Sequence, residues 1–294
     1  GGAWNRSEAV SNYNGLQVSL SRQAGRRFQY FLNYSFSKAL GTTGDDPYVE
    51  PINPRERSYG LLPWDRTHIF NASYNVLLPD FVSPGGNGFL RGLLNGWQLS
   101  GITRYASGVP FRITFSGMFY NNVRVSRAWW GHDAYSGGES NAGAVAPVFY
   151  GDPRTGNTGV GEHMLDIEQI GIPPLGESGP WQQPYDLRTP SRWNWDLTVF
   201  KNFPLGDSKR LQLRVGIFNL FNQAAPDWGD VSTDLQPVCN AFVDGVPNGA
   251  GGYANGVCDP TQGFHFDEIS ERNFGKILTK RGHRIIELAA RFDF

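Results

Sequence analysis

The sequence has little cysteine, no excess of charge of one sign and no long hydrophobic run. Its 2 cysteines, Cys239 and Cys258, are too few for a disulfide-built scaffold, and they predict either one loop disulfide or a pair of free thiols. The net charge of -1 gives no electrostatic basis for nucleic-acid binding, which calls for a clustered basic surface. No segment has the roughly 20 consecutive apolar residues that a membrane-spanning helix needs. A membrane protein of this composition would therefore have to be a β-barrel.

The residues that are abundant favour strands. The chain has 37 Gly and 19 Pro, which weaken helix interiors and argue against a helical bundle. Aromatic residues make up 14% of the chain, and their rings pack well on a pleated surface. We therefore expect an all-β fold.

Apolar and polar residues alternate with a period of two, which places each set on one face of a sheet. Near the start, for example, Leu16, Val18 and Leu20 alternate with Gln17 and Ser19. Seven segments show this pattern: 13–22, 27–38, 67–78, 96–107, 192–203, 209–220 and 286–294. Most are a little longer than the roughly 9–11 residues that a membrane strand requires.

The connections between these segments alternate in length. The connections 23–26 and 204–208 are short, 79–95 is of middling length, and three others are long: 39–66, 108–191 and 221–282. Residues 111–115 are predicted to add a further strand. Short periplasmic turns and longer extracellular loops are typical of bacterial outer-membrane barrels. This topology places the end of the chain at the periplasmic side.

The polar faces carry mostly amide and hydroxyl groups, which suit a hydrated lumen better than an open surface. A soluble β-sandwich is the alternative, and it would bring Leu16, Leu32, Leu197, Leu213 and Leu288 together in a dry centre between two layers. Aromatic residues gather near the strand ends, as in the interfacial girdles of membrane barrels. A hairpin centred on position 205 would place Asp196 and Arg214 near each other on the lumen face. We predict them as a lumen-facing pair, mainly structural in role.

Six segments together resemble the barrel of TonB-dependent receptors, in particular the Oar-like subgroup with a carboxypeptidase-regulatory-like domain. They are WDRTHIFN at 64–71, LNGWQLSGI at 94–102, SGVPF at 107–111, WDLTVFKNF at 195–203, LRVGIFNLFN at 213–222 and FGKI at 274–277. The resemblance implies a plugged transmembrane antiparallel barrel of about 22 strands in the bacterial outer membrane. Residues 1–294 would supply about its last seven strands, without the plug, the N-terminal domain or the TonB box. We therefore expect a piece of a longer protein.

The same resemblance implies uptake of a bulky substrate such as an oligosaccharide, peptide or siderophore. The implied partners are outer-membrane lipid, the TonB-ExbB-ExbD complex, and the barrel-assembly machinery, which would recognise the last strand. Phe292 and Phe294 would form this C-terminal assembly signal. A structural or secretion-related barrel without import is a second hypothesis, and a soluble all-β carbohydrate-binding or hydrolytic domain is a third.

No catalytic or metal-binding pattern emerges from the sequence. The five histidines have no metal-ligand spacing, and no serine lies in a nucleophile elbow. We expect no enzyme activity, no cofactor and no metal. Aromatic and basic residues of the connections are the candidates for substrate contact, although the rings could instead pack on one another. They are Tyr120, Trp129, Trp130, Tyr150, Trp181, Arg124 and Arg127.

Overall fold

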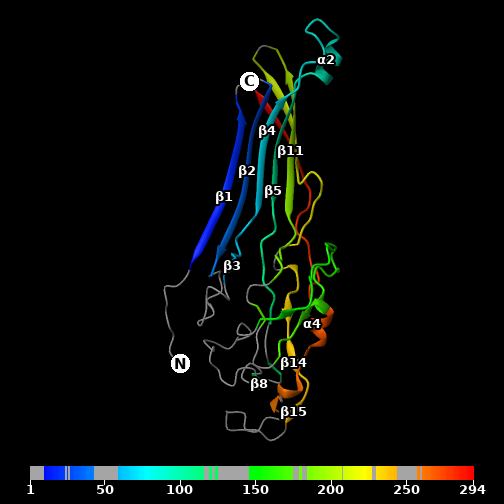
Figure 1. The fold of residues 1–294 in the computed structure, drawn as a ribbon. Helices are drawn as coiled ribbons and strands as arrows, with labels where there is room; N and C mark the ends of the chain where they lie inside the picture. Colours follow the sequence, from blue (N-terminus) through cyan, green and yellow to red (C-terminus); the bar gives the residue numbers. More distant parts are fainter. Residues whose placement is uncertain are drawn as a thin grey trace.

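The protein forms one long antiparallel sheet with a folded assembly of connections at one end (Figure 1). The computed structural model describes residues 10–23, 25, 27–42, 59–115, 119–120, 123–124, 146–174, 179–180, 184–206, 208–226, 230–243, 257–258 and 260–294. Within them, the strand order of the sheet is β1-β2-β4-β5-β11-β12-β18, and short β3 pairs with β2. The fold is therefore all-β, as expected.

The long strands match the seven predicted segments to within a few residues. They are β1 (Ser11–Arg22), β2 (Phe28–Gly41), β4 (His68–Leu77), β5 (Trp97–Ala106), β11 (Arg192–Pro204), β12 (Arg210–Phe218) and β18 (Ile285–Asp293). The short strands are β3 (Gly60–Leu61), β6 (Thr114–Phe115), β7 (Phe119–Tyr120), β8 (Val123–Arg124), β9 (Val148–Phe149), β10 (Ile170–Gly171), β13 (Asp234–Leu235), β14 (Pro237–Cys239), β15 (Phe242–Val243), β16 (Val257–Cys258) and β17 (Phe264–Phe266). The helices are α2 (Gly88–Leu94), α4 (Glu268–Asn273) and the 3-10 turns Ile167–Gln169 and Pro260–Gln262. The strand predicted at 111–115 is confirmed only in its last two residues, as β6.

The strand register places most of the apolar residues of the seven long strands on one face. Directly opposed residues of an antiparallel pair lie on the same face, so side chains of like character form rows across the sheet. One row crosses five strands through Val18, Tyr34, Phe70, Tyr105 and Trp193. A second row crosses six strands through Phe28, Val76, Leu99, Val199, Val215 and Leu288. The alternate rows, on the opposite face, carry mainly Asn, Gln, Ser and Thr, with apolar exceptions such as Phe31, Ile102 and Phe200.

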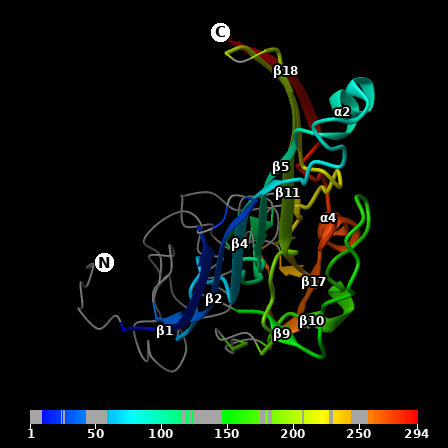
Figure 2. The ribbon, with the colours of Figure 1, turned by 90° about the horizontal axis from the view of Figure 1, so that it is seen from above.

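No second layer covers this apolar face among the described residues. Leu288 is 79% exposed, Leu16 is 59% exposed and Leu213 is also exposed, while Leu32 and Leu197 are half-buried. The five leucines spread across one surface and do not meet in a shared centre. The sandwich alternative is therefore wrong for this sheet. Figure 2 shows the sheet as a curved wall, with β1 and β18 at the two ends of the curve.

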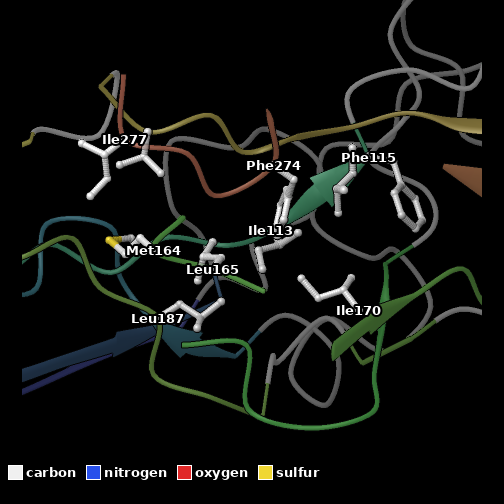
Figure 3. Close-up of a cluster of buried hydrophobic side chains, with 10 residues drawn as sticks. Ile113, Phe115, Met164, Leu165, Ile170, Leu187, Phe274 and Ile277 are labelled. Carbon is white, nitrogen blue, oxygen red and sulfur yellow. The ribbon is translucent and has the colours of Figure 1, made fainter. Parts of the chain in front are cut away.

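The buried hydrophobic core lies in the long connections (Figure 3). Its centre is fully buried and comes from segments far apart in the sequence: Ile113, Phe115, Leu165, Leu187, Leu235, Phe274 and Ile277. Backbone hydrogen bonds link these segments, including Met164 N to the Gly275 carbonyl at 2.7 Å and Ile277 N to the Glu162 carbonyl at 2.9 Å. The connections therefore form a folded unit with its own core, which we call the loop assembly.

The short turns, α2 and the end of the chain lie at the end of the sheet opposite the loop assembly (Figure 1). The sequence did not predict α2, because Gly88 and Gly92 lower its helix propensity. Asn87 starts this helix by accepting hydrogen bonds from Phe89 N and Leu90 N through its side chain. Within the described residues, no helix has the length and apolar character to cross a membrane.

Truncation of Leu165 to Ala is expected to loosen the loop assembly and leave the sheet intact. Removing a fully buried leucine side chain costs about 2–5 kcal/mol, and here the cavity would open between connections only. Hydrogen–deuterium exchange should show faster exchange at Met164 N and Ile277 N, with unchanged exchange in β11 and β12. Val160→Ala is the control, because Val160 is exposed in the same segment. Equal effects of the two substitutions would contradict a separate loop core.

Candidate functional site

A buried ion pair holds the connections against the loop end of the sheet. The carboxylate of Asp65 is fully buried, and its Oδ1 accepts a hydrogen bond from Ala39 N at 2.6 Å. Its Oδ2 accepts from Arg188 Nη2 at 2.7 Å, across 123 residues of sequence. Arg188 also donates to Asp186 at 2.9 Å and to the Gly108 carbonyl at 3.1 Å. This pair therefore ties the end of β2 to both ends of the connection between β5 and β11.

Arg66 and Ser107 extend this network. Arg66 Nη1 donates to the Ser107 carbonyl at 2.7 Å, and the Ser107 hydroxyl accepts from His68 N at 3.0 Å. Next to Ser107, a side chain on Gly108 would place its Cβ 1.6 Å from the Thr189 carbonyl oxygen, so only glycine fits there. We call Asp65, Arg66, Ser107 and Arg188 the loop clasp. Two of the segments that resemble TonB-dependent receptors, at 64–71 and 107–111, supply three of its four residues.

Burial alone would lower the pKa of Arg188, but its hydrogen bonds to Asp186 and Asp65 outweigh this effect and raise the pKa. The guanidinium therefore stays charged at every physiological pH. The carboxylate of Asp65 and that of Asp186 thus pair with this charge in a site where an unpaired charge would be costly.

Asp196 binds the backbone just after β12, at the loop end of the sheet. It does not pair with Arg214. Its Oδ1 accepts from Asn219 N at 2.9 Å and from Asn194 Nδ2 at 2.8 Å. Arg214 is directly opposite Phe200, and its guanidinium lies 5.0 Å from the centre of that ring. The two residues share the polar face as predicted, but they lie four residues apart along the strands. The prediction that Asp196 and Arg214 lie near each other is therefore wrong.

Aromatic residues cluster on the apolar face at this end of the sheet. Phe221 lies 4.8 Å from Trp195 and 5.4 Å from Trp193 between ring centres. Asn219 and Asn222 have positive φ angles of 54° and 51°, and this tight turn brings Phe221 back over the strand. The sequence predicted aromatic residues near the strand ends but did not single out Phe221, which belongs to the segment 213–222.

The polar face carries cross-strand amide contacts. Asn33 donates to Ser19 at 2.9 Å, and Gln212 donates to Asn202 at 2.9 Å. On the same face, a recess of about 370 Å³ lies between β11, β12 and β18. Gly216 forms its floor opposite Thr198 and Glu287, because glycine leaves space where other residues would fill it.

This recess, which we call the Gly216 recess, is the candidate site in the sheet. Arg214 and Glu287 supply charges of opposite sign at its rim, while Phe200 and Phe218 supply apolar surface. A ligand with hydroxyl, amide or charged groups would find both donors and acceptors there. The sequence did not identify this site because Gly216 has no side chain to mark it.

Lys201 is an exception on the apolar face. Its register partners are Trp97 and Leu213, yet its side chain is buried. The ammonium donates to the carbonyls of Leu93 and Asn95 at the end of α2, and it lies 5.0 Å from the Trp97 ring centre and 5.1 Å from that of Phe203. Carbonyl dipoles and ring faces together stabilise the charge.

The predicted substrate-contact residues are described only in part. Tyr150 is exposed beyond β9, and its ring lies over Gly171 within the loop assembly. The backbones of Tyr120 and Arg124 belong to β7 and β8, but their side chains lie outside the described part. Trp129, Trp130, Trp181 and Arg127 lie outside the described residues, as do the side chains of Cys239 and Cys258. Among the described residues no group of three His, Cys, Asp or Glu side chains is placed to hold a metal.

At the end of the chain, Phe292 lies on the apolar face opposite Leu211, and its ring stacks on that of Phe294 at 6.1 Å. Phe294 is almost fully exposed. Their role as an assembly signal stays a prediction.

Comparison with known families agrees with this geometry. A family model described as an outer membrane beta barrel domain matches residues 3–286. The chain belongs to the outer membrane beta barrel domain family. No curated protein and no solved structure matches it.

Because the chain belongs to this family, each face of the sheet can be assigned to an environment in the outer-membrane barrel. The apolar face contacts the lipid of the bacterial outer membrane, and the polar face lines the lumen. The loop assembly is extracellular, while the short turns and α2 are periplasmic. The cluster of Trp193, Trp195 and Phe221 then lies at the extracellular interface of the outer membrane, where amphipathic rings are favoured.

Leu197→Arg is expected to hinder insertion of this outer-membrane barrel, whereas Thr198→Arg is not. Leu197 lies on the lipid face near the middle of β11, where an arginine costs about 2–4 kcal/mol. Thr198 is its neighbour on the lumen face. The measurement is the urea concentration at which half of the protein is folded in lipid vesicles. Equal shifts for both substitutions would contradict the assignment of the faces.

Asp65→Ala is expected to open the loop clasp. Removing one partner of a buried ion pair costs about 3–5 kcal/mol, because the other charge is left unpaired. Faster hydrogen–deuterium exchange at Ala39 N, Val109 N and Thr189 N would report the opening. Asp152→Ala is the matched control, since the Asp152–Arg154 pair is solvent-exposed and contributes little. Unchanged exchange in Asp65→Ala would show that the clasp does not hold the connections.

Proposed function

We propose that the chain is the C-terminal part of the barrel of a TonB-dependent receptor that imports a bulky substrate. Oligosaccharides, peptides and siderophores are the substrate classes considered. Energy would come from the TonB-ExbB-ExbD complex through a region outside this chain, and the barrel-assembly machinery would recognise β18. The proposal gives the chain no catalytic role.

The observation that carries the proposal is the loop assembly at the extracellular end of the barrel. A barrel with a purely structural role needs only connections long enough to join its strands. Here the connections bury a hydrophobic core of their own and are fixed to the strands by a buried ion pair. An extracellular surface fixed in this way suits the capture of a large ligand, because preorganised binding elements lose less conformational entropy on binding.

The lumen wall supports the same role. Its groups are mostly amides and hydroxyls, with opposite charges only at isolated positions such as Arg214 and Glu287 in the Gly216 recess. Such a wall offers hydrogen bonds without a strong field of one sign, so it would accept neutral and zwitterionic solutes. The similarity of residues 64–71, 94–102 and 195–203 to TonB-dependent receptors supports the family-level part of the proposal.

The test is energised uptake by cells that carry the full-length protein. Accumulation of labelled oligosaccharides, peptides and siderophore complexes should require both the protein and the proton-motive force. Gly216→Leu should reduce uptake by about tenfold, or ~1.4 kcal/mol, if the recess contacts the solute during passage. A side chain fits there without displacing backbone, because the nearest atom to a Cβ on Gly216 is 3.6 Å away.

Gly85→Leu is the control, since it adds the same side chain to a periplasmic turn where nothing lies within 4 Å. Uptake that persists after an uncoupler is added would contradict energised import. If cells without the protein lose surface structure or secretion but show no uptake defect, the structural or secretion-related hypothesis is favoured.

A further inference from the structure

The periplasmic helix α2 presents apolar side chains to its surroundings. Phe89 is 78% exposed and Leu93 is 53% exposed, and Leu90, Leu94 and the preceding Phe81 are exposed as well. None of its seven residues is buried. A helix this short is not stable in water by itself, so its stability must come from what packs against it. Water is an unfavourable neighbour for this surface.

An apolar groove lies between α2 and the lipid face of the barrel. It has a volume of about 590 Å³. Its lining comprises Gly88, Phe89, Gly92 and Leu93 of the helix and Trp97, Val199, Lys201, Phe203, Leu213 and Val215 of the strands. The accessible surface of the groove is almost entirely apolar. Ligand pockets commonly have volumes of about 300–1,000 Å³, so the groove has the size of a binding site.

The groove is continuous with the surface that contacts lipid. Val199 and Val215 form part of the apolar register row that crosses β2 to β18. The groove therefore opens onto membrane hydrocarbon, at the level of the periplasmic interface. A protein partner in the periplasm would have to displace this lipid to reach it.

Lys201 fixes the helix over the groove. Its ammonium binds the carbonyls of Leu93 and Asn95 and so holds the C-terminal end of α2 against β11. The adjoining Gly96 has a φ of 76°, and a Cβ there would lie 2.5 Å from the Asn202 carbonyl oxygen, which keeps the chain close to the strand. Because the lysine charge is satisfied by the protein, the groove itself offers only apolar contacts.

The same helix carries one basic residue outside the groove lining. Arg91 is exposed, and its Nη1 donates to the Pro84 carbonyl at 2.6 Å. Helices that lie in a membrane interface combine an apolar surface with basic side chains that face lipid phosphates. Arg91, Phe89 and Leu93 satisfy this requirement within one short helix.

We propose that α2 lies in the periplasmic leaflet of the outer membrane and that the groove beneath it binds one acyl chain of a phospholipid. The phosphate of this lipid lies beside Arg91. The site rests on the lipid-facing surface of the barrel and is independent of the proposed uptake.

The test uses the full-length protein in nanodiscs of phosphatidylethanolamine and phosphatidylglycerol with a small fraction of a phospholipid that carries a photoreactive acyl chain. After illumination, labelled peptides should contain the groove-lining parts of α2 and β11. Gly92→Phe should reduce this labelling by about tenfold, because the ring fills the groove. A Cβ on Gly92 meets nothing within 4 Å, so the substitution is accommodated.

Gly85→Phe is the matched control, because it adds the same ring in the same connection but outside the groove, where a Cβ also meets nothing within 4 Å. Equal labelling of the two variants would overturn the proposal. Cross-linking of α2 to a protein, and not to lipid, in native membranes would overturn it as well.

A second measurement needs no change in the helix. Phospholipids brominated on the acyl chain should quench the fluorescence of Trp97 in the groove, measured as the difference between the unchanged protein and Trp97→Phe. Absence of this difference would also overturn the proposal.

Discussion

The fold depends on the register of the seven long strands. Because directly opposed residues share a face, the apolar residues of every strand join into rows that cross the sheet only when each pair is aligned as observed. A shift of one residue in any pair would move a whole strand's apolar side chains into the lumen. Lipid, and not a second protein layer, then supplies the apolar environment. In the part of the chain that the structure describes, the sheet therefore has no hydrophobic core of its own to which the connections might attach.

This constraint explains why the loop assembly is built as it is. Its buried leucines, isoleucines and phenylalanines contact one another and leave the wall of the barrel free. The connections attach to the strand ends through polar groups, in the loop clasp and the Asp196–Asn219 contact, and through the packing of Phe221 on Trp193 and Trp195. Hydrogen bonds are directional, so hydrogen bonds to backbone groups can orient the loop assembly. Apolar contacts are non-directional. Stability and placement of the extracellular unit thus come from different interactions.

The sequence predicted the strands well because alternation is a local signal, and its seven segments agree with β1, β2, β4, β5, β11, β12 and β18. It misplaced the Asp196–Arg214 pair because the hairpin is centred on position 207 and not 205, as the pairing of Pro204 with Arg210 shows. A shift of two residues in the turn moves the expected partner by four. The Asp65–Arg188 pair spans 123 residues, so no local pattern indicated it. The groove under α2 was missed for a similar reason, since it forms only where the helix and three strands meet.

Lys201 shows how a charge is tolerated on the lipid face and what it provides. In hydrocarbon an unsatisfied lysine would cost about 2–4 kcal/mol near the middle of the membrane, and less towards the interface. Here two carbonyls at the end of α2 and two aromatic rings surround the ammonium. The helix gains a cation at its negative end, and the cation gains acceptors that lipid lacks. This exchange explains why a seven-residue segment with two glycines is helical at this point, and why its apolar side chains are held outward at the membrane surface.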